Sequence, residues 1–255
     1  WRLLFVVPLL FLPLCRAVAR SLPESRRFVA AAATDADDEL RHTPEARRHI
    51  RARLVLLAGS GFLLATFQAP SNQFLNDFLK DERGFDASGI SLFRVMVSVP
   101  GILGIVIGGR LAELKGRRGI GALAVTVGTA AWIGLYTVTG APMWLFGVVS
   151  IIFSAATVPA LGVYGPELFP TQLRARANAV ITSVSVMGSA TGLVLAGQLD
   201  DRFDGLGPAM ALLAIGPLLV VGLILRFYPE TAARELEDLN PEDAPLTSQL
   251  RDPLS

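Results

Sequence analysis

The sequence predicts an all-α membrane protein with seven transmembrane helices, and three observations support this. The 255-residue chain is 52% hydrophobic and has a mean hydropathy of +0.50, which is too apolar for a soluble domain. Its apolar residues form seven runs, each close to the ~20 residues that a helix needs to cross a bilayer. Most charged residues gather between these runs. The runs cover residues 3–21, 54–74, 89–108, 120–138, 143–164, 178–199 and 208–227.

The distribution of cations predicts which side of the membrane each loop faces. Cytoplasmic loops carry an excess of Lys and Arg. If the spans alternate in direction, 18 of the 23 Lys and Arg residues fall on one side and four on the other, while Arg94 lies within a span. We therefore expect a multi-pass protein of the cell membrane whose charged linker and carboxyl-terminal tail are cytoplasmic.

Charged segments divide the chain into four parts. Residues 22–53 are rich in Arg and acidic residues and cannot cross a membrane. We predict one transmembrane helix over residues 1–21, a cytoplasmic linker over 22–53, a six-helix bundle over 54–228 and a polar cytoplasmic tail over 229–255. The chain begins with Trp1 rather than Met, so we also expect that the start of the protein is missing.

The short basic loop at residues 109–119 contains a recognisable pattern of Gly, Leu, an acid, Gly and two cations. The pattern reads Gly109-x-Leu111-Ala112-Glu113-x-x-Gly116-Arg117-Arg118. It resembles the loop signature of the major facilitator superfamily, which joins the second and third spans of each six-span half. The chain departs from that signature at Glu113, where Asp is commoner, and at Leu114, which replaces a usual cation.

Three further motifs resemble the sugar porter family within that superfamily. The segment Tyr164-x-x-Glu167-x-x-Pro170-Thr171-x-x-Arg174 resembles the signature after the tenth span and matches it at every position. Pro23-Glu24-Ser25-x-Arg27 resembles the motif after the sixth span, and Pro229-Glu230-Thr231 the motif after the twelfth. The resemblance implies spans six to twelve of a twelve-helix transporter. Residues 1–21 would then end the amino-terminal half, and the missing remainder of that half would be a partner of this chain.

The resemblance also implies a function. It indicates secondary active or facilitative transport of a small solute, a sugar or a similar metabolite, by alternating access of two bundles about a central site. The motif charges lie at cytoplasmic helix ends, so we expect them to form an inner-gate network, with a direct pair between Glu113 and Arg174; the alternative is a static role in orienting loops. The expected members are Glu113, Arg117, Arg118, Glu167, Arg174, Glu24, Arg27 and Glu230.

Polar side chains within the spans are the candidate substrate-binding residues. Gln68, Asn72 and Gln73 surround Pro70, which should break or kink its helix. Amides are costly in hydrocarbon and should face a water-filled cavity; the alternatives are an interhelical hydrogen-bond clamp or a frayed outer end of the helix. They do not reproduce the amide pattern of the sugar porters. Arg94, about one and a half turns inside the outer boundary, either snorkels to the outer interface or faces a polar path.

Two other patterns concern contacts between helices and contacts with the membrane interface. Gly188-x-x-x-Gly192-x-x-x-Ala196 is a ridge of small residues that favours close approach of two helices. Trp132 and Tyr136 lie near the outer end of their span, and we interpret them as part of an aromatic belt at the membrane interface.

Several classes of function are disfavoured. The sequence has no Walker-type phosphate-binding motif, no nucleophile–base arrangement and no metal-ligand cluster, so we expect neither an enzyme nor a cofactor. A net charge of +1 gives no surplus that would indicate nucleic acid. A transporter of organic ions or other metabolites, or a receptor with this fold, remains an alternative. A channel would need a continuous polar stripe, which no span has. Proton or sodium coupling is left open, because no carboxylate lies inside a span.

Overall fold

The structure is a computed structural model that describes residues 11–21 and 44–232. The described residues form helices joined by short turns and contain no strand. The elements are α1 (Leu12–Ser21), α4 (Pro44–Gln73), α5 (Leu75–Asp77), the π-helix η3 (Phe78–Glu82), α6 (Ala87–Ser98), α7 (Gly101–Lys115), α8 (Arg117–Thr137), α9 (Ala141–Leu161), α10 (Tyr164–Glu167), α11 (Thr171–Phe203), α12 (Leu206–Leu213) and α13 (Ile215–Phe227).

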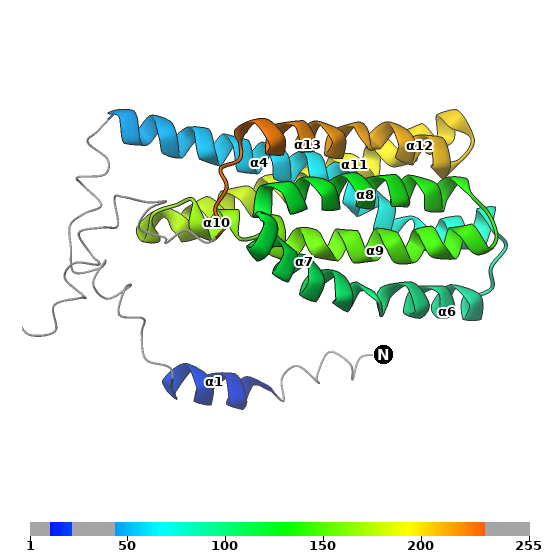
Figure 1. Cartoon of the computed structure of the whole chain (residues 1–255). Helices are drawn as coiled ribbons and strands as arrows, with labels where there is room; N and C mark the ends of the chain where they lie inside the picture. Colours follow the sequence, from blue (N-terminus) through cyan, green and yellow to red (C-terminus); the bar gives the residue numbers. More distant parts are fainter. Residues whose placement is uncertain (1–10, 22–43, 233–255) are drawn as a thin grey trace, which may run out of the picture.

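Within the described part of the chain, six helical segments are long and apolar enough to cross a membrane. They match, in order, the six spans predicted between residues 54 and 228, so the all-α membrane fold is confirmed. The segments are Arg47–Glu82, Ala87–Lys115, Arg117–Thr137, Ala141–Leu161, Leu173–Phe203 and Leu206–Phe227. The predicted span over residues 3–21 lies partly outside the described residues. Its described part, α1, lies apart from the bundle (Figure 1).

The six spans form one bundle in which consecutive spans run in opposite directions (Figure 1). The predicted small-residue ridge joins α11 to α4. A Cβ added at Gly188 would lie 2.5 Å from the backbone oxygen of Phe62, and one added at Gly192 would collide with the backbone of Thr66. Ala196, the last residue of the ridge, is fully buried. The ridge therefore serves helix packing, as expected from its spacing.

The path from α6 to α7 bends where Pro100 precedes the first residue of α7 (Figure 1). A backbone N–H at the start of a helix has no partner within that helix. Proline, which lacks this N–H, therefore loses no hydrogen bond at this position. Glycines then bring α7 against α9: a Cβ at Gly108 would lie 2.8 Å from the Cα of Ala156. The bend and the close approach fix the position of the loop that follows α7.

Apolar side chains face outward from the bundle as well as inward. Ile102, Leu145 and Met187 are each more than 60% exposed. Such residues on three different spans suit contact with lipid rather than with water. Polar helix ends and an apolar belt are therefore arranged as a bilayer requires.

Trp132 and Tyr136 do not form the predicted aromatic belt. Each is only 1% exposed. The indole Nε1 of Trp132 donates a hydrogen bond to Ser154 Oγ at 3.1 Å, and the hydroxyl of Tyr136 donates to the backbone oxygen of Ser71 at 2.7 Å. The belt interpretation is therefore wrong: both rings point into the bundle, where each polar group has found a partner.

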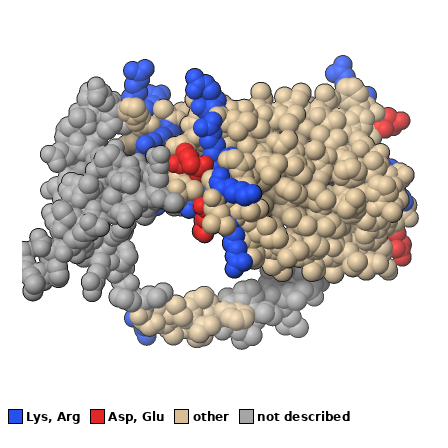
Figure 2. Space-filling model, in the orientation of Figure 1, with Lys and Arg blue, Asp and Glu red and all other residues tan. Residues whose placement is uncertain are grey.

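The two ends of the bundle differ in charge, as the topology predicts (Figure 2). We call the end where α4 and α8 begin and α7 and α13 end the basic end, and the opposite one the acidic end. The basic end carries Arg47, Arg48, Arg51, Arg53, Arg110, Lys115, Arg117, Arg118, Arg174, Arg176 and Arg226. The acidic end carries Asp77, Asp81, Glu82, Asp86, Asp200, Asp201 and Asp204.

Candidate functional site

An ion pair at the basic end joins two of the motifs. The guanidinium Nη1 of Arg117, at the start of α8, pairs with Glu167 Oε1 at the end of α10. The two side chains are only 16% and 17% exposed. Arg117 Nη1 also lies 3.2 Å from Thr231 Oγ1, so the same side chain reaches the segment after α13. Removing one partner of such a shielded pair leaves a poorly solvated charge, which costs more than at an exposed site.

Glu230 caps the same helix from the segment after α13. Its carboxylate accepts hydrogen bonds from the backbone N–H groups of Arg117 at 2.8 Å, Arg118 at 3.2 Å and Ala232 at 3.1 Å. Burial alone would raise the pKa of Glu230, but these backbone donors outweigh it, and the net pKa lies below its usual value. The carboxylate therefore stays ionised at neutral pH, at the positive end of the α8 dipole.

Gly116 makes this cap possible. Its φ of 99° is in a region that favours glycine, and a Cβ there would lie 2.6 Å from Glu230 Oε2. The glycine of the loop signature is thus required both by the backbone turn between α7 and α8 and by the approach of the carboxylate.

The short helix α10 is held from two sides. The hydroxyl of Tyr164 donates to the backbone oxygen of Pro229 at 3.0 Å, and its ring packs edge-on against Tyr228 with centroids 4.9 Å apart. On the other side, Arg53 Nη1 of α4 donates to the backbone oxygen of Leu168 at 3.0 Å. Four segments that are distant in sequence therefore meet around Arg117 and Glu167. We call Arg117, Glu167, Glu230 and Thr231 the latch.

The structure brings together only part of the predicted inner-gate network. Arg117, Glu167 and Glu230 are joined directly, and Arg118 takes part through its backbone N–H. Glu24 and Arg27 lie outside the described residues.

The expected pair between Glu113 and Arg174 is not formed. Glu113 is exposed in the last turn of α7, and within the described residues no ion pair joins it to Arg174. Arg174 is half-buried and turns back toward its own loop, where Nη2 donates to the backbone oxygen of Phe169 at 3.4 Å. The acid that pairs across helices is Glu167, at the end of α10, which the guanidinium of Arg117 reaches from the start of α8.

Two of the candidate substrate-binding residues meet near the acidic end. Arg94 of α6 donates from Nε to Asn76 Oδ1 at 2.9 Å and from Nη2 to the backbone oxygen of Asn72 at 2.8 Å. The Asn72 side chain donates to the backbone oxygen of Gln68 at 3.0 Å. Arg94 therefore clamps α6 to the last turn of α4 and to α5. Gln73 is exposed. The helix α4 runs through Pro70 and ends only at Gln73.

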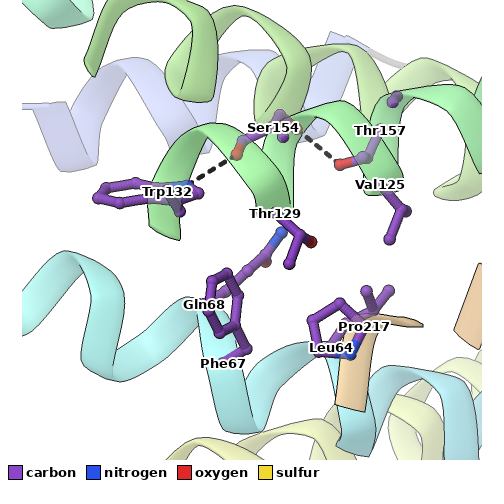
Figure 3. Close-up of a pocket in the computed structure, with 11 residues that line it drawn as sticks. Leu64, Phe67, Gln68, Val125, Thr129, Trp132, Ser154, Thr157 and Pro217 are labelled. Atoms are coloured by element: carbon purple, nitrogen blue, oxygen red, sulfur yellow. Dashed lines mark hydrogen bonds between the residues drawn. The ribbon is translucent and has the colours of Figure 1, made fainter. Parts of the chain in front are cut away.

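Gln68 lies elsewhere, in a pocket inside the bundle (Figure 3). Its neighbours include Thr129, Trp132, Ser154 and Thr157, from α8 and α9. The cavity measures only about 10 Å³, room for about one water molecule, so it does not hold a metabolite in this conformation. The residues predicted to form the site do not include Thr129, Ser154 and Thr157, although hydroxyls in the middle of apolar spans are a usable signal.

Six apolar helices in the described part of the chain, with a charged latch at one end, define a multi-pass α-helical membrane protein. The family model of the Major Facilitator Superfamily matches residues 57–254, and the chain belongs to that superfamily. A curated relative, the "Probable metabolite transport protein CsbC" of Bacillus subtilis (strain 168), is 24% identical over 163 residues. The match covers 59% of this chain and 33% of the relative, so the chain spans about a third of the relative's length.

Proposed function

We propose that the protein containing this chain moves a small metabolite across a membrane by alternating access, and that this chain supplies its carboxyl-terminal bundle. The superfamily supports transport of a small solute, and the relative named above is a metabolite transport protein. The sugar porter-like motifs favour a sugar or a similar metabolite, moved by facilitated diffusion or as a symporter. The amino-terminal half of the same transporter would form the opposite wall of the central site.

The observation that carries the proposal is the latch. Arg117 ties α8, α10 and the segment after α13 into one unit at the basic end. An exposed ion pair contributes only about 0–1 kcal/mol, whereas these side chains are largely shielded and act together. A network of this kind can bias an equilibrium between two conformations. We infer that it is intact when the basic end is closed and loosens when that end opens.

The proposed substrate-facing residues are Gln68, Asn72, Gln73 and Arg94. Three of them lie in the last two turns of α4, and Arg94 holds those turns from α6. The basic end is proposed to be cytoplasmic, since Lys and Arg gather there and cytoplasmic loops carry that excess. The linker and tail would then be cytoplasmic too, in a protein of the cell membrane.

Uptake by the full-length protein in sealed vesicles tests the proposal. A panel of labelled sugars, polyols and organic acids would be offered, with and without a proton or sodium gradient. We expect saturable accumulation of at least one of them, abolished in vesicles without protein. Binding of a solute with no uptake under any gradient would instead indicate a receptor and refute the transport function.

A further inference from the structure

An open groove lies on the outer surface of the bundle, between the first turns of α4 and the last turns of α13. Its volume is about 730 Å³, against about 10 Å³ for the interior pocket. Five of the residues that α4 contributes, from Arg48 to Leu63, recur at spacings of three and four, so these five share one face of that helix. Its lining includes Arg48, Arg51, Val55, Gly59 and Leu63 of α4 and Phe227 of α13.

The end of this groove nearest the start of α4 is cationic. Arg48 and Arg51 are exposed and lie about one turn apart. Neither guanidinium forms an ion pair or a hydrogen bond within the part of the chain that the structure describes. Arg53 differs, because it is half-buried and donates to Leu168. Two cations are therefore available to a ligand at the mouth of the groove.

The rest of the groove is apolar. Val55, Gly59 and Leu63 follow Arg51 along α4, and Phe227 lies on the α13 side. Val55 is 65% exposed and Phe227 is 59% exposed. A Cβ added at Gly59 would meet nothing within 4 Å, so the floor is recessed there. From Arg51 to Leu63 the floor runs about 18 Å along the helix axis, at 1.5 Å per residue.

An occupant of this groove has to match a cationic mouth and an apolar floor about as long as one leaflet's hydrocarbon. In a membrane the basic end lies at the level of the headgroups, so the floor descends among the acyl chains. Basic pockets between helices at that level suit anionic headgroups. We propose that the groove binds one anionic phospholipid of the adjacent leaflet, with its phosphate against Arg48 and Arg51 and an acyl chain over Gly59.

Other occupants fit less well. A water-soluble metabolite gains nothing from an exposed apolar floor. An extended peptide would leave backbone N–H and C=O groups unpaired at the depth of the hydrocarbon, which is strongly unfavourable. A lipid has no such groups along its chain. This site is separate from the latch and the pocket around Gln68, so it stands independently of the transported solute.

Native mass spectrometry of the purified full-length protein tests the contact between the lipid phosphate and the two arginines. Dioleoyl phosphatidylglycerol is the probe, and dioleoyl phosphatidylcholine is the zwitterionic reference. We expect one phosphatidylglycerol to bind more tightly than any phosphatidylcholine. Changing both Arg48→Gln and Arg51→Gln should weaken that binding roughly 25-fold, at about fivefold for each lost cation. The control changes Arg47→Gln and Arg110→Gln, exposed arginines of the basic end that do not line the groove.

A second pair of variants tests the apolar part. Gly59→Phe should fill the groove and displace the lipid while leaving both arginines in place. Gly222→Phe is the control, because Gly222 also has open space around an added Cβ but does not line the groove. Both variants place a bulky residue at an open helical position, so both should fold. Excess inorganic phosphate should not displace the lipid, since it lacks the acyl chain.

Three outcomes would overturn the lipid site. Equal retention of phosphatidylglycerol by the Arg48/Arg51 variant and its control would show that these arginines do not bind the headgroup. Equal retention of phosphatidylglycerol by Gly59→Phe and Gly222→Phe would show that no acyl chain lies over Gly59. Absence of any tightly bound phosphatidylglycerol on the wild-type protein would mean that another part of the full-length protein covers the groove.

Discussion

The carboxylate of Glu230 caps the first turn of α8, where Oε1 accepts a hydrogen bond from the backbone N–H of Arg117 at 2.8 Å. A helix begins with N–H groups that have no partner within it, so a carboxylate there is doubly favoured, by hydrogen bonds and by the dipole. The cap uses only the backbone of Arg117. Its guanidinium is thereby left for Glu167, and one residue connects α8 to two other segments.

Breaking the ion pair of the latch should affect stability and transport together. We expect Arg117→Gln and Glu167→Gln each to destabilise the full-length protein by about 1–3 kcal/mol, since each removes one side of an ion pair that is largely shielded from water. Uptake should slow while solute binding persists, because the latch lies about half a bilayer from a mid-membrane site. Thermal unfolding and uptake rates measure the two effects.

Arg118→Gln is the matched control for the latch. Arg118 contributes its backbone N–H, which the substitution keeps. Its effect should be well below that of Arg117→Gln. Similar losses in the two variants would show that the basic end needs only positive charge, and not this particular pair.

The low pKa of Glu230 predicts a pH dependence. A carboxyl whose pKa is lower in the folded state stabilises the fold fully above its unfolded pKa, about 4.3, and the contribution fades as pH falls through the folded value. The difference in unfolding temperature between wild type and Glu230→Gln should therefore be constant from neutral pH down to about pH 5 and should shrink below that. A difference that grows on acidification would contradict the cap.

Gly116→Ala should be destabilising by about 1–2 kcal/mol, because the alanine would meet both a positive φ and the Glu230 carboxylate. Gly119→Ala is the comparison. A Cβ at Gly119 meets nothing within 4 Å, and alanine favours a helix by about 0.8–1 kcal/mol over glycine. Opposite shifts in unfolding temperature are expected. Equal shifts would mean that the turn at Gly116 tolerates a side chain.

The spans were predictable because length and hydropathy alone determine whether a helix can cross a bilayer. The residues at which the helices begin and end were less predictable. The predicted span beginning at residue 54 continues a helix that starts at Pro44, since the arginines before residue 54 remain helical outside the apolar run. Hydropathy reports how apolar a segment is and not whether its charged extension is helical.

The directions in which the side chains point were harder to predict from the sequence. In a span that is apolar on all sides, no periodicity marks the face that points inward, so Trp132 and Tyr136 were assigned to the interface when both are buried. The motifs did indicate that Arg117, Glu167 and Glu230 belong to one end. Their spacing could not show that Glu167, rather than Glu113, is the acid that meets an arginine, because that depends on which helix ends come together in the bundle.

Cysteine labelling tests the proposed orientation. Ser88, at the acidic end, and Arg110, at the basic end, are both exposed. In a background without other cysteines, in which Cys15→Ser removes the only one of this chain, Ser88→Cys should react with an impermeant thiol reagent applied to intact cells. Arg110→Cys should react only after permeabilisation. The reverse order of labelling would place the basic end outside the cell.

The contacts of Arg94 allow its two possible roles to be separated. A guanidinium has five N–H donors, and hydrogen bonds to Asn76 and to the backbone of Asn72 use only two of them. The remaining donors can meet a solute if this end of α4 faces the transport path. Asn76→Ala should loosen the orientation of Arg94 and weaken solute binding a few-fold. Arg94→Ala should weaken it more than tenfold, because it removes the donors as well. Equal effects of the two variants on binding, with equal losses in unfolding temperature, would make Arg94 a clamp alone.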